Sequence, residues 1–246
     1  MADRDTEMGQ GPRAFPETSW SLIAGIQGQG GDRDRGFQTL CERYWRAIYS
    51  YLRQGMGRGN EEAKELTQAF FTWLLEGEVL ARYSAERASF RHYLKGLLRN
   101  FVSNEDQARR RQKRGGEVKH VALGGGEQDL QRLEELLADE KGISPEEAFD
   151  LAWVHELLER AVELLKAEQQ DGQGLRWRVY EAYELAPAGE QPTYASVAAA
   201  LEVKPSDVRN HLFAARERLR TLVREELRAT VADESQLEEE WQLVFA

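Results

Sequence analysis

Apolar residues recur every three or four positions along most of the chain, whereas alternating runs of β-branched residues are scarce. This spacing places apolar side chains along one face of an α-helix. It predicts helices over about 37–54, 61–76 and 88–111, and a short helix over 20–27. Residues 28–36 are rich in glycine and predict a flexible turn. We therefore expect an all-α fold.

The second half of the chain begins with glycines and an acidic run, which together mark a linker over 115–143. Ser144, Pro145 and Glu147 then form a strong helix-start signal. Serine caps the helix, proline suits its first position, and glutamate three residues after the serine closes a capping box. A further helix is expected over about 175–185.

These patterns divide the chain into two helical domains joined by an acidic linker, with an extension at each end. The parts are an N-terminal extension (1–36), a first domain (37–114), the linker (115–143), a second domain (144–232) and an acidic tail (233–246). The apolar residues of the tail predict an amphipathic helix that packs on the second domain.

Residues 193–227 read TYASVAAALEVKPSDVRNHLFAARERLRTLVREEL. Thr193 can cap a short helix, Pro205 stops it, and Ser206 can cap a longer basic helix. This order predicts a helix-turn-helix, whose second helix enters the major groove of DNA. An ordinary helical hairpin with a solvated face is the alternative. The side chains expected on the outer face are Arg209, Asn210, His211, Phe213 and Arg218.

Composition limits the function classes. A hydrophobic content of 41% is too high for a disordered chain, and the lone Cys41 excludes an internal disulfide. There is no apolar run that could span a membrane and no secretory signal. We expect a soluble cytoplasmic protein. The four histidines are scattered without metal-ligand spacing, so we expect no metal. No Ser/His/Asp or Cys/His arrangement can be proposed, so we expect no cofactor and no enzymatic activity.

The net charge of −10 is unevenly distributed. Residues 82–119 hold eleven Lys and Arg against four Asp and Glu, residues 127–168 hold four against thirteen, and residues 204–228 hold seven against four. Two basic zones that flank an acidic one suggest two contacts with a polyanion. Solvated helix faces are the alternative.

The first basic zone contains FRHYLKGLLRNFVSNEDQARRRQKR (90–114), in which aromatic and cationic side chains alternate. Bases of unpaired DNA stack on aromatic rings while cations follow the phosphates, so this stretch suits separated strands. A core helix with a basic tail is the competing interpretation.

Three blocks of the chain, in order, resemble the extracytoplasmic-function sigma factors of bacterial RNA polymerase. EEAKELTQAFFTWLL (61–75) is similar to their polymerase-binding motif, D-A-E-D-L-T-Q-E-x-F-x-x-L-L. Residues 90–111 resemble the block that engages and melts the start-proximal (−10) promoter element. VKPSDVRNHLFAARERL resembles the reader of the upstream (−35) element, V-x-x-G-T-V-K-S-R-L-x-R-A-R-x-x-L. The extensions at both ends suggest a subgroup of this family.

The resemblance implies a factor that binds core RNA polymerase through its clamp helices and flap and directs it to promoter DNA, with an anti-sigma or other regulator as a further partner. The implied polymerase contacts are Glu65, Leu66, Gln68 and Phe71. Contacts to the start-proximal element are Phe90, Tyr93, Arg99 and Asn100, with phosphates held by Arg109, Arg110, Arg111, Lys113 and Arg114. Contacts to the upstream element include Ser206, Arg209 and Arg216. Several residues depart from the family pattern, among them Ser206, His211 and Ala214.

Two other functions are compatible with the sequence. A sigma-like decoy or adaptor would copy the fold to sequester a regulator, which suits the altered positions 206, 211 and 214. A conventional helix-turn-helix regulator would bind duplex DNA without polymerase, but it leaves the 61–75 motif unexplained.

Overall fold

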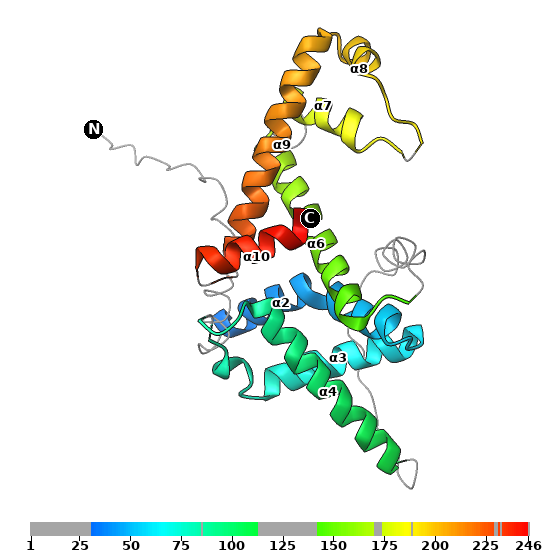
Figure 1. Ribbon diagram of the computed structural model, residues 1–246, viewed down its shortest axis with the longest axis vertical. Helices are drawn as coiled ribbons and strands as arrows, with labels where there is room; N and C mark the ends of the chain where they lie inside the picture. The colour runs from blue at the N-terminus through cyan, green and yellow to red at the C-terminus, as the bar shows by residue number, and fades with distance from the viewer. Residues whose placement is uncertain are drawn as a thin grey trace, which may run out of the picture.

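The computed structural model describes residues 31–84, 86–112, 142–169, 174–187, 189–228, 231 and 233–245, and these residues form helices and connecting turns without strands (Figure 1). The expected all-α class is confirmed. The helices are α2 (Gly31–Ser50), α3 (Asn60–Glu76), α4 (Phe90–Gln112), α6 (Pro145–Glu168), α7 (Leu175–Glu184), α8 (Tyr194–Leu201), α9 (Pro205–Arg228) and α10 (Glu234–Phe245). A π-helical turn, η1 (Tyr51–Gly55), extends α2, and a 3₁₀ turn, η2 (Leu80–Arg82), precedes α4.

The molecule is elongated, with a helical bundle at one end and a helix-turn-helix at the other (Figure 1). Helices α2, α3 and α4 form the bundle, and its largest fully buried side chains include Tyr44, Tyr49, Phe70 and Phe90. The long helix α9 connects the two ends, because its C-terminal half lies near the bundle and its N-terminus lies at the far tip.

The start of α6 has the predicted capping box. The Ser144 hydroxyl accepts a hydrogen bond from the Glu147 amide (3.3 Å), and the Glu147 carboxylate accepts one from the Ser144 amide (2.9 Å). Pro145 occupies the first turn. This end of α6 lies directly on η1, where a Cβ added to Gly55 would come within 2.2 Å of the Pro145 Cα. The glycine therefore permits the close approach of the two backbones.

Most buried side chains belong to one core that extends from α2 to α10. Phe149, Trp153 and Leu157 of α6 pack with the bundle, and Leu222 and Leu227 of α9 belong to the same cluster. A second, smaller cluster joins α7, α8 and the start of α9. The core thus does not divide between residues 114 and 144, where the sequence suggested a domain boundary. The sigma-like division into two domains stays a prediction.

A buried charge cluster fixes α9 against the bundle. Glu226 of α9 is 5% exposed and lies 3.8 Å from the guanidinium of Arg43 on α2 and 3.6 Å from that of Arg160 on α6. Burial lowers the pKa of Arg160, and the neighbouring Arg43 acts in the same direction. Glu226 and Glu156 offset part of this lowering. Removing Glu226 would therefore leave both cations without this counter-charge.

The tail forms the expected amphipathic helix, α10, which lies across the C-terminal part of α9 (Figure 1). Leu237 is fully buried, and the Arg224 guanidinium of α9 lies 5.5 Å from the centre of the Trp241 ring. The tail also contacts α4 through Glu240, which the sequence did not predict.

Two local predictions are corrected. Residues 31–36, expected in a flexible turn, belong to α2. Helix α9 begins at Pro205, and its first amide bonds run to the carbonyl of Lys204, so Ser206 lies inside the first turn and does not cap it. The predicted helix at 20–27, the linker over 115–141, and Lys113 and Arg114 lie outside the described residues.

Candidate nucleic-acid interface

The turn between α8 and α9 orients the start of the long helix. Thr193 caps α8 by accepting from the Ser196 amide (3.1 Å), as its sequence predicted. At the other end Glu202 adopts a left-handed conformation (φ 56°), which reverses the chain and lets the Val203 amide bond to the Ala198 carbonyl (3.0 Å). Val208 and Leu212 of α9 are buried against α8, so the opposite face points outward.

The first turns of α9 present an outward stripe of four side chains: Ser206, Arg209, Asn210 and Phe213, all exposed. Among the described residues, neither Arg209 nor Asn210 has a side-chain hydrogen bond or an ion pair. Phe213 is 67% exposed. His211, also predicted on this face, is half-buried. The stripe combines a cation, an amide and an aromatic ring on one helical face, which suits the edges and methyl groups of bases in a major groove.

The cations farther along α9 are engaged with carboxylates. Arg216 donates to Glu184 of α7 (2.7 Å), and Arg218 donates to Glu168 of α6 (2.9 Å). Hydrogen bonding to Glu168 raises the pKa of Arg218. In this conformation both guanidinium groups tie α9 to its neighbours. That Arg216 and Arg218 contact DNA stays a prediction.

Arg224 and Arg228 likewise pair with Glu234 of α10, at 2.6 and 2.5 Å. Arg220 pairs with Glu217 one turn earlier at 2.5 Å. The arginines of α9 thus divide at Phe213: Arg209 precedes it without a partner in the described chain, and those after it are paired.

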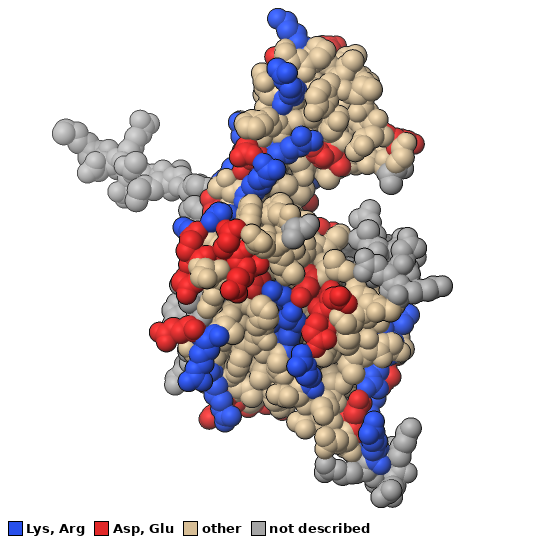
Figure 2. Space-filling view, in the orientation of Figure 1, with Lys and Arg blue, Asp and Glu red and all other residues tan. Residues whose placement is uncertain are grey.

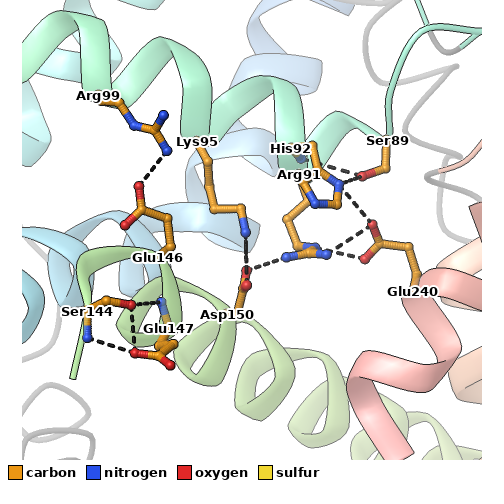
Figure 3. Close-up of polar contacts among 10 residues, drawn as sticks. All are labelled: Ser89, Arg91, His92, Lys95, Arg99, Ser144, Glu146, Glu147, Asp150 and Glu240. Carbon is orange, nitrogen blue, oxygen red and sulfur yellow. Dashed lines mark hydrogen bonds and ion pairs between the residues drawn. The ribbon is translucent and has the colours of Figure 1, made fainter.

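The second predicted interface, on α4, is arranged differently (Figure 3). Arg91 is 4% exposed, and its Nε donates to Glu240 of α10 (2.7 Å). The same guanidinium bonds to Asp150 of α6 and lies 5.1 Å from the centre of the Trp153 ring. Burial opposes the charge on Arg91, but the hydrogen bonds and charges of Glu240 and Asp150 outweigh it and raise its pKa.

Two more cations of α4 face α6. Lys95 donates to both carboxylate oxygens of Asp150 (2.8 Å each), and Arg99 donates to Glu146 (2.6 Å) (Figure 3). The pKa of Arg99 is raised chiefly by its hydrogen bond to Glu146. Lys95 is nearly buried, whereas the Arg99 side chain is 64% exposed. In this conformation carboxylates of α6 and α10 bind Arg91, Lys95 and Arg99 of α4.

The aromatic residues predicted to stack on bases are mostly structural. Phe90 is fully buried between Tyr44 (5.5 Å between ring centres) and Tyr83 (5.2 Å), so its assignment to DNA is corrected. Tyr93 is half-buried, and its hydroxyl donates to the Val79 carbonyl. These rings stabilise the bundle and present little free face.

The polar residues of α4 are more accessible. Asn100 is exposed and shows no side-chain partner in the described part of the chain. Arg110 is exposed as well, whereas Arg109 pairs with Glu62 of α3 (2.7 Å). Arg111 lies in the last turns of α4.

The predicted polymerase-binding residues separate into inner and outer positions on α3. Leu66 and Phe71 are each 2% exposed and lie in the core, where the Phe71 ring stacks on Trp45 (5.9 Å). Their assignment as partner contacts is corrected, because an apolar stripe on a helix is buried first by its own fold. Glu65 is exposed and Gln68 is half-buried, so only these two reach the surface.

Charged side chains are unevenly distributed over the surface. Lys and Arg side chains project at the upper tip, where α9 begins, whereas Asp and Glu gather lower down, around α10 in the middle of the molecule (Figure 2). Within the described ranges, no cluster of His, Cys, Asp and Glu could hold a metal ion. The helices described are all too short or too polar to cross a membrane.

Comparison with models of protein families, with curated proteins and with solved structures finds no match for this chain. The geometry of the two basic helices is therefore the basis for a functional assignment.

Proposed function

We propose that this chain is a sigma-type initiation factor, which binds core RNA polymerase and directs it to promoters in the cytoplasm. The observation that carries the proposal is the stripe of Arg209, Asn210 and Phe213 on the second helix of a helix-turn-helix. Arginine and asparagine can each bind a purine edge through two hydrogen bonds, and the first turns of such a helix are the part that enters the groove.

The bundle is assigned to polymerase binding and to the start-proximal element. Glu65 and Gln68 of α3 are its polymerase contacts, and Asn100 with Arg99 and Arg110 on α4 are its contacts to separated strands. Arg99 is held by Glu146 in the free chain, so this ion pair must open before Arg99 can bind a phosphate. Polymerase binding would supply the free energy for that change, because it can favour the open state.

A conventional helix-turn-helix regulator is the second candidate, and one specific observation favours it. The stripe on α9 is accessible without any rearrangement, whereas four of the cations that the structure describes on α4 are engaged with carboxylates: Arg91, Lys95, Arg99 and Arg109. A protein that used only α9 would bind duplex DNA alone and would need no polymerase.

One experiment separates these functions. The purified chain is added to bacterial core RNA polymerase on a library of promoter fragments, and transcripts are sequenced. Specific transcript starts support the sigma function. Sequence-specific binding of duplex DNA without any transcripts supports the regulator instead. If neither transcripts nor duplex binding is observed, the decoy or adaptor function is supported.

A matched pair of variants assigns the result to α9. Arg209→Ala should abolish or shift the selected starts, because this guanidinium has no partner among the residues that the structure describes. Arg220→Ala, on the same helix but paired within the helix to Glu217, should leave them unchanged. Equal effects of the two substitutions would contradict the assignment of the reading surface.

A further inference from the structure

Phe213 is the most exposed large hydrophobic side chain in the described residues. It is 67% exposed, compared with 49% for Leu185, the next in order. A phenylalanine left in water forgoes the favourable free energy that its burial would give. Phe213 belongs to neither hydrophobic cluster and stacks on no ring that the structure describes. The fold therefore gains little from an aromatic ring at this position.

The position of Phe213 places it within the reading stripe. Arg209 and Asn210 precede it by four and three residues, so the three side chains lie on one helical face. The next residue in register is Glu217, whose carboxylate is paired with Arg220 and would repel phosphates. The stripe from Ser206 to Phe213 rises roughly 10 Å along the helix, the length of about three base pairs.

The chemistry of the major groove offers one apolar group to such a ring. Thymine presents a C5-methyl group there, whereas the other base edges present hydrogen-bond donors and acceptors. An aromatic ring placed over those polar edges would leave them unpaired and desolvated, which is unfavourable. Packing against a thymine methyl incurs no such cost.

We propose that Phe213 is a specificity residue that packs on the methyl group of a thymine, in the same window of about three base pairs that Arg209 and Asn210 read. This inference rests on the proposed function, because it requires α9 to enter the major groove. The occupant of the exposed ring is thus duplex DNA. Arg209 supplies the charge complementarity to that partner, and the acidic Glu217 limits the contact on the C-terminal side.

The test exchanges single methyl groups in the DNA. The chain is reconstituted with core RNA polymerase, and the preferred upstream duplex is selected from random sequence. Each thymine of that duplex is then replaced by deoxyuridine, which lacks only the methyl group. We expect one position at which wild-type affinity falls about fourfold, the effect of exposing one methyl-sized group. Phe213→Ala should bind the thymine and uracil duplexes equally.

Two controls accompany the exchange. Leu185→Ala removes another exposed apolar side chain outside the stripe and should retain the wild-type sensitivity to uracil. Thermal unfolding of both variants should match the wild type, since neither side chain is buried. A selected duplex to which wild type and Phe213→Ala show the same response to uracil would overturn the inference and leave the proposed function standing. Failure to select any duplex would overturn both.

Discussion

The two basic helices of this protein differ in what their charges contact. On α4, Arg91, Lys95 and Arg99 are bound to carboxylates of α6 and α10. On α9, Arg209 has no such partner among the described residues, and its neighbours on the outer face are exposed. The stretch around α4 carries the larger net positive charge in the sequence, yet α9 has the more accessible reading surface.

The difference shows that the net charge of a stretch of sequence does not tell how many of its cations are free to bind a ligand. A cation on the edge of an apolar stripe is drawn toward the core, and it must bring a carboxylate with it. Arg91 does so with Glu240 and Asp150. A cation on the opposite face of the apolar stripe, such as Arg209, stays in solvent and keeps its hydrogen-bond donors free for a ligand.

The largest expected effect concerns the buried ion pairs of α4. Arg91→Met leaves Glu240 buried without its main partner, so the free energy of unfolding should fall by about 3–5 kcal/mol. The double variant Arg91→Met with Glu240→Leu should recover much of the loss, because no unpaired charge then remains between α4 and α10. Urea denaturation measures both values.

The control for that prediction is Arg87→Met, which removes an exposed arginine just before α4. It should leave the urea midpoint unchanged. If Arg87→Met and Arg91→Met lowered stability equally, the buried network would have no special role in holding α10 to the bundle.

The next largest effect concerns the exposed stripe on α9. Arg209→Ala should weaken binding of the selected duplex by about 1–3 kcal/mol, because it removes a bidentate base contact. Arg218→Ala should weaken it much less, since Glu168 and Glu225 already occupy that guanidinium. Fluorescence anisotropy at one fixed salt concentration compares them. Equal losses would mean that the ion pairs of α9 open on binding.

A smaller effect is expected from releasing α4 without unfolding it. Glu146→Gln removes the carboxylate that holds Arg99, so the free protein should bind single-stranded DNA more tightly, by less than about fivefold because the pair is exposed. Glu163→Gln, at an exposed position on the same helix, serves as the control. Filter binding at low and high salt detects the change, and no difference between the variants would argue against masking of α4 by Glu146.

The smallest effect is a pH dependence at the edge of the buried network. Burial lowers the pKa of His92 below 6.5, helped by Arg91 and Lys95 and opposed by Glu240 and Asp150. The folded state therefore binds this proton less readily than the unfolded state. Stability from His92 is fully present above pH 6.5 and is lost as the pH falls toward the lowered pKa. His92→Gln should flatten the decrease in Tm between about pH 7 and 5.5, and an unchanged slope would contradict it.

The sequence predicted the parts of the fold that depend on local rules. The capping box at Ser144 and the N-cap at Thr193 depend on residues three positions apart, and the buried face of α9 follows from its helical spacing. The outward position of Phe213 followed from the same periodicity. These features need no knowledge of the neighbouring helices.

The wrong predictions concern side chains whose burial depends on the packing of neighbouring helices. Phe90, Leu66 and Phe71 fit a binding motif, but they also occupy apolar stripes, and the bundle buries them. The pairing of Arg91 with Glu240 joins residues 149 positions apart. One signal was present in the tail: Glu240 lies three residues after Leu237 and beside Trp241, on the apolar side of its helix. A carboxylate in that position predicts a buried cationic partner, though not which one.

The central claim is that the stripe on α9 is open to DNA in the free and the polymerase-bound protein, whereas the paired cations of α4 become available to DNA only after α6 and α10 release them. Photo-crosslinking tests it most directly, with p-benzoylphenylalanine in place of Phe213 in one variant and of Asn100 in another. With the selected promoter, the account predicts crosslinks from position 213 with or without core polymerase, and from position 100 only with it. Equal crosslinking of both positions in the free protein, or none from position 100 with polymerase present, would contradict it.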